Sequence, residues 1–143
     1  MANRTRTEAD LSIHDGPYRS FEWFWDANGS MPGLDAYDSL PASSQDDFLA
    51  SVRHWGNVEP GSRPAQSRVN QEHADPLVVA IKAGKHRFTA FREESGPTWI
   101  VCKHYLKESQ QRDKAGDRVV KQTIKSREFY LSTVKDGTYY ERN

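Results

Sequence analysis

Residues 76–131 carry three short runs of β-forming residues followed by one long helical pattern. The runs are PLVVAIK (76–82), HRFTAFRE (86–93) and TWIVCKHYLK (98–107). Two short connections, 83–85 and 94–97, separate them, and each contains a glycine, which accepts the positive φ of hairpin turns at little cost. The pattern therefore predicts a three-stranded antiparallel meander followed by a helix over about 112–131. This order constrains the fold more than any other feature of the chain.

Charge is distributed unevenly along the chain. The 143 residues contain 20 Lys and Arg and 20 Asp and Glu, a net charge of zero. Residues 1–79 nevertheless hold 6 basic against 12 acidic side chains, whereas residues 80–143 hold 14 against 8. Such asymmetry indicates a surface for a polyanion such as nucleic acid, an acidic element that shields a basic one, or solvated faces of opposite sign. Charge alone does not decide among these interpretations.

The preceding sequence supplies one more strand and two helices. The patterns predict a strand at 18–25, a short helix at 33–40, a second helix at 42–57 and a long loop at 57–75. Residues 1–15 are polar and lack periodicity, which predicts a flexible N-terminus before a single domain over 16–143. The expected fold is α+β, with an antiparallel sheet of about four strands packed against two N-terminal helices and one C-terminal helix.

Several classes of protein are disfavoured by the sequence. No apolar run approaches the roughly 20 residues of a membrane-spanning helix, and the N-terminus lacks the apolar segment of a signal peptide, so we expect a cytoplasmic protein without membrane contact. The single Cys102 lies among apolar residues and is expected to be buried rather than nucleophilic. The chain also lacks a phosphate-cradling glycine loop, a dinucleotide fingerprint and a serine nucleophile elbow.

Local motifs follow one another in a recognisable order. FEWFWDANG ends in an Asp and Gly turn, LDAYDSLP ends in a Leu-Pro pair, FLASVRHWG is a helix pattern that ends in glycine, and AIK, HRFTAF and YLKESQ follow. This succession resembles the RelE/ParE toxin superfamily, in particular its HigB-like and phage-derived branch, over roughly residues 18–131. The chain departs from that pattern at Ile81-Lys82, His86-Arg87 and Lys107-Glu108, where the family has Leu-Arg, Tyr-Arg and paired lysines.

The resemblance implies a function and a partner. It implies a small RelE-like toxin that cleaves messenger RNA, usually in the ribosomal decoding site, without a metal or another cofactor. It also implies a cognate antitoxin with a helix-turn-helix DNA-binding domain. Two alternatives stay open: a non-catalytic toxin that, like ParE, binds DNA gyrase, and an interaction protein of a phage or mobile element with the same fold. The charge asymmetry is also compatible with a homodimer.

Five side chains are candidates for catalysis. Metal-free RNA cleavage needs a base for the ribose 2′-hydroxyl, stabilisation of the added negative charge and an acid for the leaving oxygen. The resemblance makes Arg87 the strand arginine that would contact the phosphate, with Lys82 and Lys107 as flanking cations. His86 and His104 are the histidines of the meander, and imidazole titrates near neutrality. For the lysines and histidines, the alternative is an ordinary solvent-exposed position.

Further residues are expected to bind RNA. They are Lys85, Lys103, Arg92, Arg63, Arg68 and Tyr105. Lysine and arginine neutralise phosphates and an aromatic ring can stack on a base, although Tyr105 could equally be a core residue. The remaining histidines, His14, His54 and His73, have no metal-ligand spacing with a cysteine or carboxylate, so we predict no metal site.

Overall fold

The computed structural model describes residues 7–94, 96–108 and 114–141. The elements are α1 (Glu8–Leu11), β1 (Ser12–Asp15), β2 (Ser20–Trp23), α2 (Pro32–Asp38), α3 (Ala42–Gly56), β3 (Val69–His73), β4 (Val78–Ala83), β5 (His86–Arg92), β6 (Thr98–Leu106) and α4 (Lys114–Lys135). The predicted α+β class is confirmed. Within the described ranges, no helix combines the length and apolar character needed to cross a membrane.

A six-stranded mixed sheet forms the centre of the molecule. The strand order is β1-β2-β6-β5-β4-β3, in which β2 and β6 are parallel and every other neighbouring pair is antiparallel. The predicted antiparallel meander is present as β4, β5 and β6. The prediction of a purely antiparallel sheet of about four strands is wrong, because the sheet has six strands and β2 runs parallel to β6. The chain between β2 and β6 includes α2, α3, β3, β4 and β5. This long connection allows β2 and β6 to run in the same direction.

Two strands at the edges of the sheet were not predicted. β3 lies within the segment expected to be a loop; its sequence VNQEH has one apolar residue, Val69, which is buried. An edge strand can be short and polar because little of it has to face the core. At the other edge, α1 and β1 occupy residues 8–15, which we expected to be flexible. Leu11 is fully buried and β1 pairs with β2, but one buried leucine gives no periodicity in the sequence.

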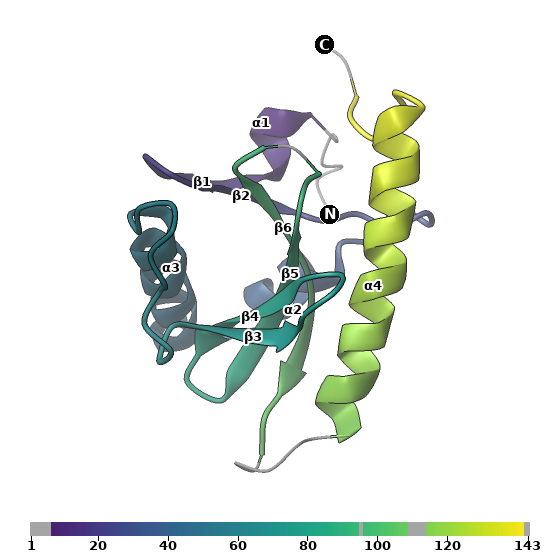
Figure 1. The fold of residues 1–143 in the computed structure, drawn as a ribbon. Helices are drawn as coiled ribbons and strands as arrows, with labels where there is room; N and C mark the ends of the chain where they lie inside the picture. The colour runs from purple at the N-terminus through teal and green to yellow at the C-terminus, as the bar shows by residue number, and fades with distance from the viewer. Residues whose placement is uncertain (1–6, 95, 109–113, 142–143) are drawn as a thin grey trace.

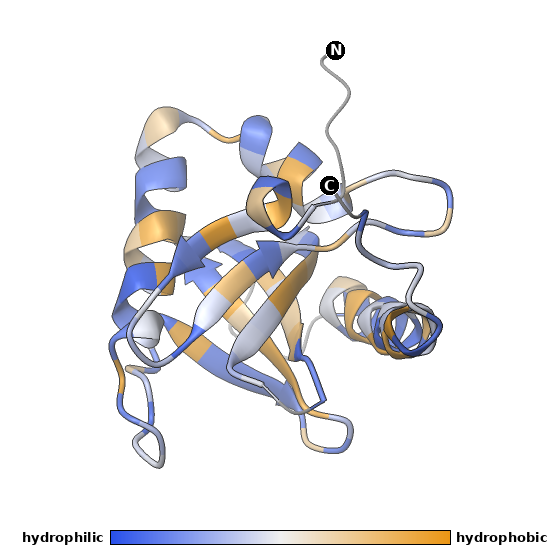
Figure 2. Cartoon of the chain, turned by 90° about the horizontal axis from the view of Figure 1, so that it is seen from above, coloured by the Kyte–Doolittle hydropathy of each residue, from blue (hydrophilic) through white to orange (hydrophobic). Residues whose placement is uncertain are grey.

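Helices cover both faces of the sheet, with α2 and α3 on one face and α4 on the other (Figure 1). On the α3 face, the Phe48 ring lies 5.5 Å from Trp23 and 4.5 Å from Phe88, measured between ring centroids. On the α4 face, Phe91 packs on Tyr130 at 5.4 Å. Hydrophobic residues recur along the central strands, whereas the connecting loops are mostly hydrophilic (Figure 2). The sheet therefore separates two cores, each of which contains several aromatic residues.

The α4 helix matches the helix predicted over about 112–131, although residues 112 and 113 lie outside the described ranges, and it continues to Lys135. After α4 the chain turns at Gly137, whose φ of 74° suits glycine. The C-terminal segment then returns to the sheet. Tyr139 is buried and stacks on Trp25 at 4.7 Å, and the Tyr140 hydroxyl donates a hydrogen bond to a carboxylate oxygen of Glu22 at 2.7 Å.

Candidate nucleic-acid interface

Three side chains of the meander lie side by side in one row on the α4 face of the sheet: Lys82, Arg87 and Tyr105. Arg87 of β5 is the direct partner of Lys82 on β4 and of Tyr105 on β6. Residues paired in this way on antiparallel strands point to the same face of the sheet. The Tyr105 ring lies against the first turn of α4, where a Cβ atom added to Gly116 would come within 3.1 Å of it. The row therefore faces α4.

Lys107 joins this row from the segment after β6. Its backbone N–H donates to the Lys85 carbonyl at 2.8 Å, which closes the end of the meander. Burial lowers the pKa of Lys82, and the positive charges of Arg87 and Lys107 lower it further, while Glu72 opposes them. The cations thus act on one another electrostatically. We call Lys82, Arg87 and Lys107 the basic row.

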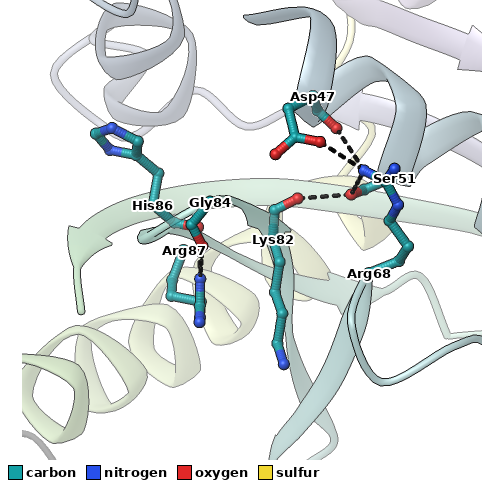
Figure 3. Close-up of polar contacts among 7 residues, drawn as sticks. All are labelled: Asp47, Ser51, Arg68, Lys82, Gly84, His86 and Arg87. Carbon is teal, nitrogen blue, oxygen red and sulfur yellow. Dashed lines mark hydrogen bonds and ion pairs between the residues drawn. The ribbon is translucent and has the colours of Figure 1, made fainter. Parts of the chain in front are cut away.

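The side chain of Arg87 is held by backbone oxygens. Its Nη1 donates to the carbonyl of Gly84 at 2.5 Å and to that of His86 at 3.1 Å (Figure 3). Its Nε is buried, and no described residue accepts a hydrogen bond from it. A buried N–H of this kind is costly when it stays unsatisfied. The two Nη1 bonds hold the guanidinium in place.

Glu72 was not predicted as a site residue. Its Oε1 accepts a hydrogen bond from the Tyr105 hydroxyl at 3.1 Å. Glu72 lies at an irregularity in the pairing of β3 with β4, within the segment that the sequence analysis predicted as loop. No periodicity in the sequence marks it. The bond holds Tyr105 beside the basic row and brings one negative charge to it.

The two candidate histidines lie on the opposite face of the sheet. The His104 ring packs against Phe88 at 5.0 Å, in the α3-face core, and His86 Nδ1 lies 2.9 Å from His104 Nε2. Burial lowers the pKa of His104, and the neighbouring His86 lowers it further. Figure 3 shows the His86 side chain directed away from those of Lys82 and Arg87. The five predicted catalytic residues therefore divide into three cations on one face and two paired imidazoles on the other.

The residues predicted to bind RNA are dispersed. Lys85 is exposed in the turn beside the basic row, and Lys103 pairs with Thr89, whose hydroxyl bonds Thr123 of α4 at 2.6 Å. These two lysines flank the row. Arg92 is exposed at the far end of β5, and Arg63 is exposed in the loop before β3. Arg92 therefore does not lie beside the basic row.

Arg68 and Tyr105 have structural contacts. Arg68 Nη1 forms an ion pair with Asp47 Oδ1 at 2.7 Å and donates to Ser51 Oγ at 3.3 Å (Figure 3). The Ser51 hydroxyl in turn donates to the Lys82 carbonyl at 2.6 Å. Arg68 therefore ties the start of β3 to α3. Tyr105 is only 7% exposed, so it packs beneath α4 and presents little surface for stacking on a base.

No family model matches the chain, and no curated protein matches it. Among the residues that the structure describes, no group of three or more His, Cys, Asp or Glu side chains is placed to hold a metal ion.

Proposed function

We propose that the protein is an RNA-cleaving toxin of the RelE/HigB-like type and that the scissile phosphate binds at the basic row. The observation that carries this proposal is the register of β4, β5 and β6, which aligns Lys82 with Arg87 beside Lys107. The succession of β2, α2 and α3, then β4, β5, β6 and α4 also supports a RelE-like fold, with β3 as an additional edge strand between α3 and β4. Nothing in the proposal requires the two histidines, which lie behind the sheet.

Each member of the basic row has a task in RNA cleavage. The guanidinium of Arg87, fixed by two carbonyls, would bind the phosphate and stabilise the negative charge that it gains in the transition state. Lys82, whose pKa is lowered by burial and by its cationic neighbours, is the best placed group to accept the 2′-hydroxyl proton. Lys107 would donate a proton to the leaving oxygen. Glu72 and Tyr105 would position these groups.

The proposed partners follow from the same reasoning. Messenger RNA on the ribosome is the substrate, and a cognate antitoxin with a helix-turn-helix domain is the inhibitor. Co-expression with the small open reading frame beside the gene is expected to restore growth. If no neighbouring frame encodes such a domain, the assignment to a toxin–antitoxin pair loses its support.

The decisive experiment compares Arg87→Ala with a matched arginine. Arg53 is exposed on α3, on the other face of the sheet, and Arg53→Ala serves as the control. Each protein is induced in cells and also incubated with messenger RNA and ribosomes. We expect Arg87→Ala to cleave about 100- to 1,000-fold more slowly, the usual effect of removing one stabilising donor from a transition state. Arg53→Ala should cleave like the wild type.

Two results would refute the proposal. One is intact messenger RNA after incubation with wild-type protein and ribosomes; the other is equal cleavage by wild type and by folded Arg87→Ala protein, with folding checked by urea denaturation. Growth arrest without cleavage, combined with inhibited supercoiling by DNA gyrase, would favour the ParE-like alternative. Expression without any effect on growth would favour an interaction protein with this fold.

A further inference from the structure

Two imidazole nitrogens face each other across β5 and β6. His86 Nδ1 lies 2.9 Å from His104 Nε2, and the two ring centroids are 5.1 Å apart. In the register of the two strands, His86 pairs with Leu106 and His104 pairs with Phe88, so the histidines are diagonal neighbours on one face. The sheet itself sets this spacing. The proximity therefore does not depend on a loop.

Such a pair suits a metal ion. Without a ligand, one imidazole has to donate its N–H to the other, so one ring acts as donor and the other as acceptor. A tetrahedral zinc ion binds imidazole nitrogens at about 2.0–2.1 Å, which sets them roughly 3.3 Å apart. The nitrogens of His86 and His104 would have to separate by a few tenths of an ångström. The two rings now point almost directly at each other, so both would also have to turn until their lone pairs converge on one ion.

The surroundings give one rigid side and one open side. The His104 ring is backed by Phe88 at 5.0 Å, and Phe88 packs on Phe48 at 4.5 Å. His86 instead lines a surface hollow of about 710 Å³, which Asp46 of α3 also lines. The hollow leaves room for water ligands. The Asp46 carboxylate favours a cation there, and the ammonium group of Lys85, which also lines the hollow, opposes it.

We infer that His86 and His104 are the protein ligands of a transition-metal site on the α3 face, with water completing the coordination. Two imidazoles select ions such as Zn²⁺, Ni²⁺ and Cu²⁺, and among these Cu²⁺ should bind most tightly. Mg²⁺ and Ca²⁺, which take oxygen ligands, should not bind there. The site lies across the sheet from the basic row, and this inference does not depend on RNA cleavage.

The test is a metal titration of the full-length protein without an affinity tag. Calorimetry with Zn²⁺ should give one ion per chain, and Mg²⁺ should give no heat at that site. His86→Gln and His104→Gln should each weaken Zn²⁺ binding by about 100-fold, since even the loss of a residue that only orients a ligand costs 10- to 100-fold. His73→Gln is the matched control, because the His73 Nδ1 contacts the Pro76 carbonyl at 2.8 Å. It should bind Zn²⁺ as the wild type does.

A second measurement guards against unfolded variants. His104 is half-buried, so His104→Gln could alter the fold, whereas His86 lines the surface hollow. The thermal unfolding of both variants is therefore compared with that of the wild type in the absence of metal. Electron paramagnetic resonance with Cu²⁺ should show nitrogen couplings from two imidazoles in the wild type and from one in His86→Gln. If Zn²⁺ does not bind, or if folded His86→Gln binds it as tightly as the wild type, the inference is wrong.

Discussion

Glu22 is a carboxyl group in the interior of the protein, and its ionisation should oppose folding. It lies on β2, is 8% exposed, and accepts a hydrogen bond from the Tyr140 hydroxyl at 2.7 Å. Burial raises the pKa of Glu22 from its ordinary 4.5 to about 7; the Tyr140 bond opposes the rise, and the charges of Glu8 and Glu93 add to it. The perturbation that tests this environment is Glu22→Gln, whose amide oxygen can still accept the Tyr140 bond.

The sign and size of the effect follow from the difference in pKa. Below about pH 4.5 the Glu22 carboxyl is protonated in both states, so it does not oppose folding. Between about pH 4.5 and 7 the unfolded chain loses this proton while the folded chain keeps it, so stability falls as pH rises. Above about pH 7 both states are ionised and the whole cost is present. One pKa unit corresponds to about 1.4 kcal/mol, so the rise from 4.5 to about 7 costs about 3 kcal/mol.

Urea denaturation of wild type and Glu22→Gln at several pH values from about 4.5 to 8 measures this cost. All other carboxyl groups titrate in both proteins, so the difference in the free energy of unfolding isolates Glu22. The free energy of unfolding of Glu22→Gln, relative to that of the wild type, should rise by about 3 kcal/mol across this range, with most of the change between about pH 5 and 7. Glu94→Gln, at an exposed carboxyl, should show no such trend. A wild-type-minus-variant difference that stays constant with pH would refute the reasoning.

Two further predictions concern the cores. Phe48→Ala should lower the free energy of unfolding by about 3–5 kcal/mol, because its fully buried ring contacts Trp23 and Phe88; Val134→Ala, at a side chain 39% exposed, should change it by less than about 0.5 kcal/mol in the same urea titration. Burial raises the pKa of the Cys102 thiol to about 11, so a thiol reagent should modify it only as the protein unfolds. Rapid modification of the native protein would contradict that burial.

The strands could be predicted where apolar residues alternate. Phe21 and Trp23 of β2 enter the α3-face core, and Phe24, directly after β2, enters the α4-face core, as the alternation in YRSFEWFW predicts. Trp25 departs from it: the pattern assigns it to the face of Trp23, but β2 ends at Trp23 and Trp25 packs on the α4 side. Alternation holds only while the backbone stays extended. The edge strands escaped prediction because they carry too few apolar residues to alternate.

The candidate site could be predicted only in part. The motif order singled out Lys82, Arg87 and Lys107, and the structure brings these cations together. Glu72 could not be found, because its contact with Tyr105 joins residues that are distant in the chain through an irregular edge strand. Contacts of this kind depend on tertiary packing, which a local sequence pattern does not record.

One irregularity in β6 decides which side chains meet on each face. Trp99 and Val101 enter the α3-face core, so strict alternation would direct Tyr105 to the same face and His104 to that of Arg87. The pairing with β5 shifts between Thr89 and Ala90, so that β6 carries one extra residue there. Beyond this bulge the faces are exchanged: His104 meets Phe88 on the α3 face, and Tyr105 reaches the first turn of α4. A regular β6 would have placed the imidazole of His104 in the basic row. The bulge instead leaves that row to cations and pairs the two histidines on the opposite face of the sheet.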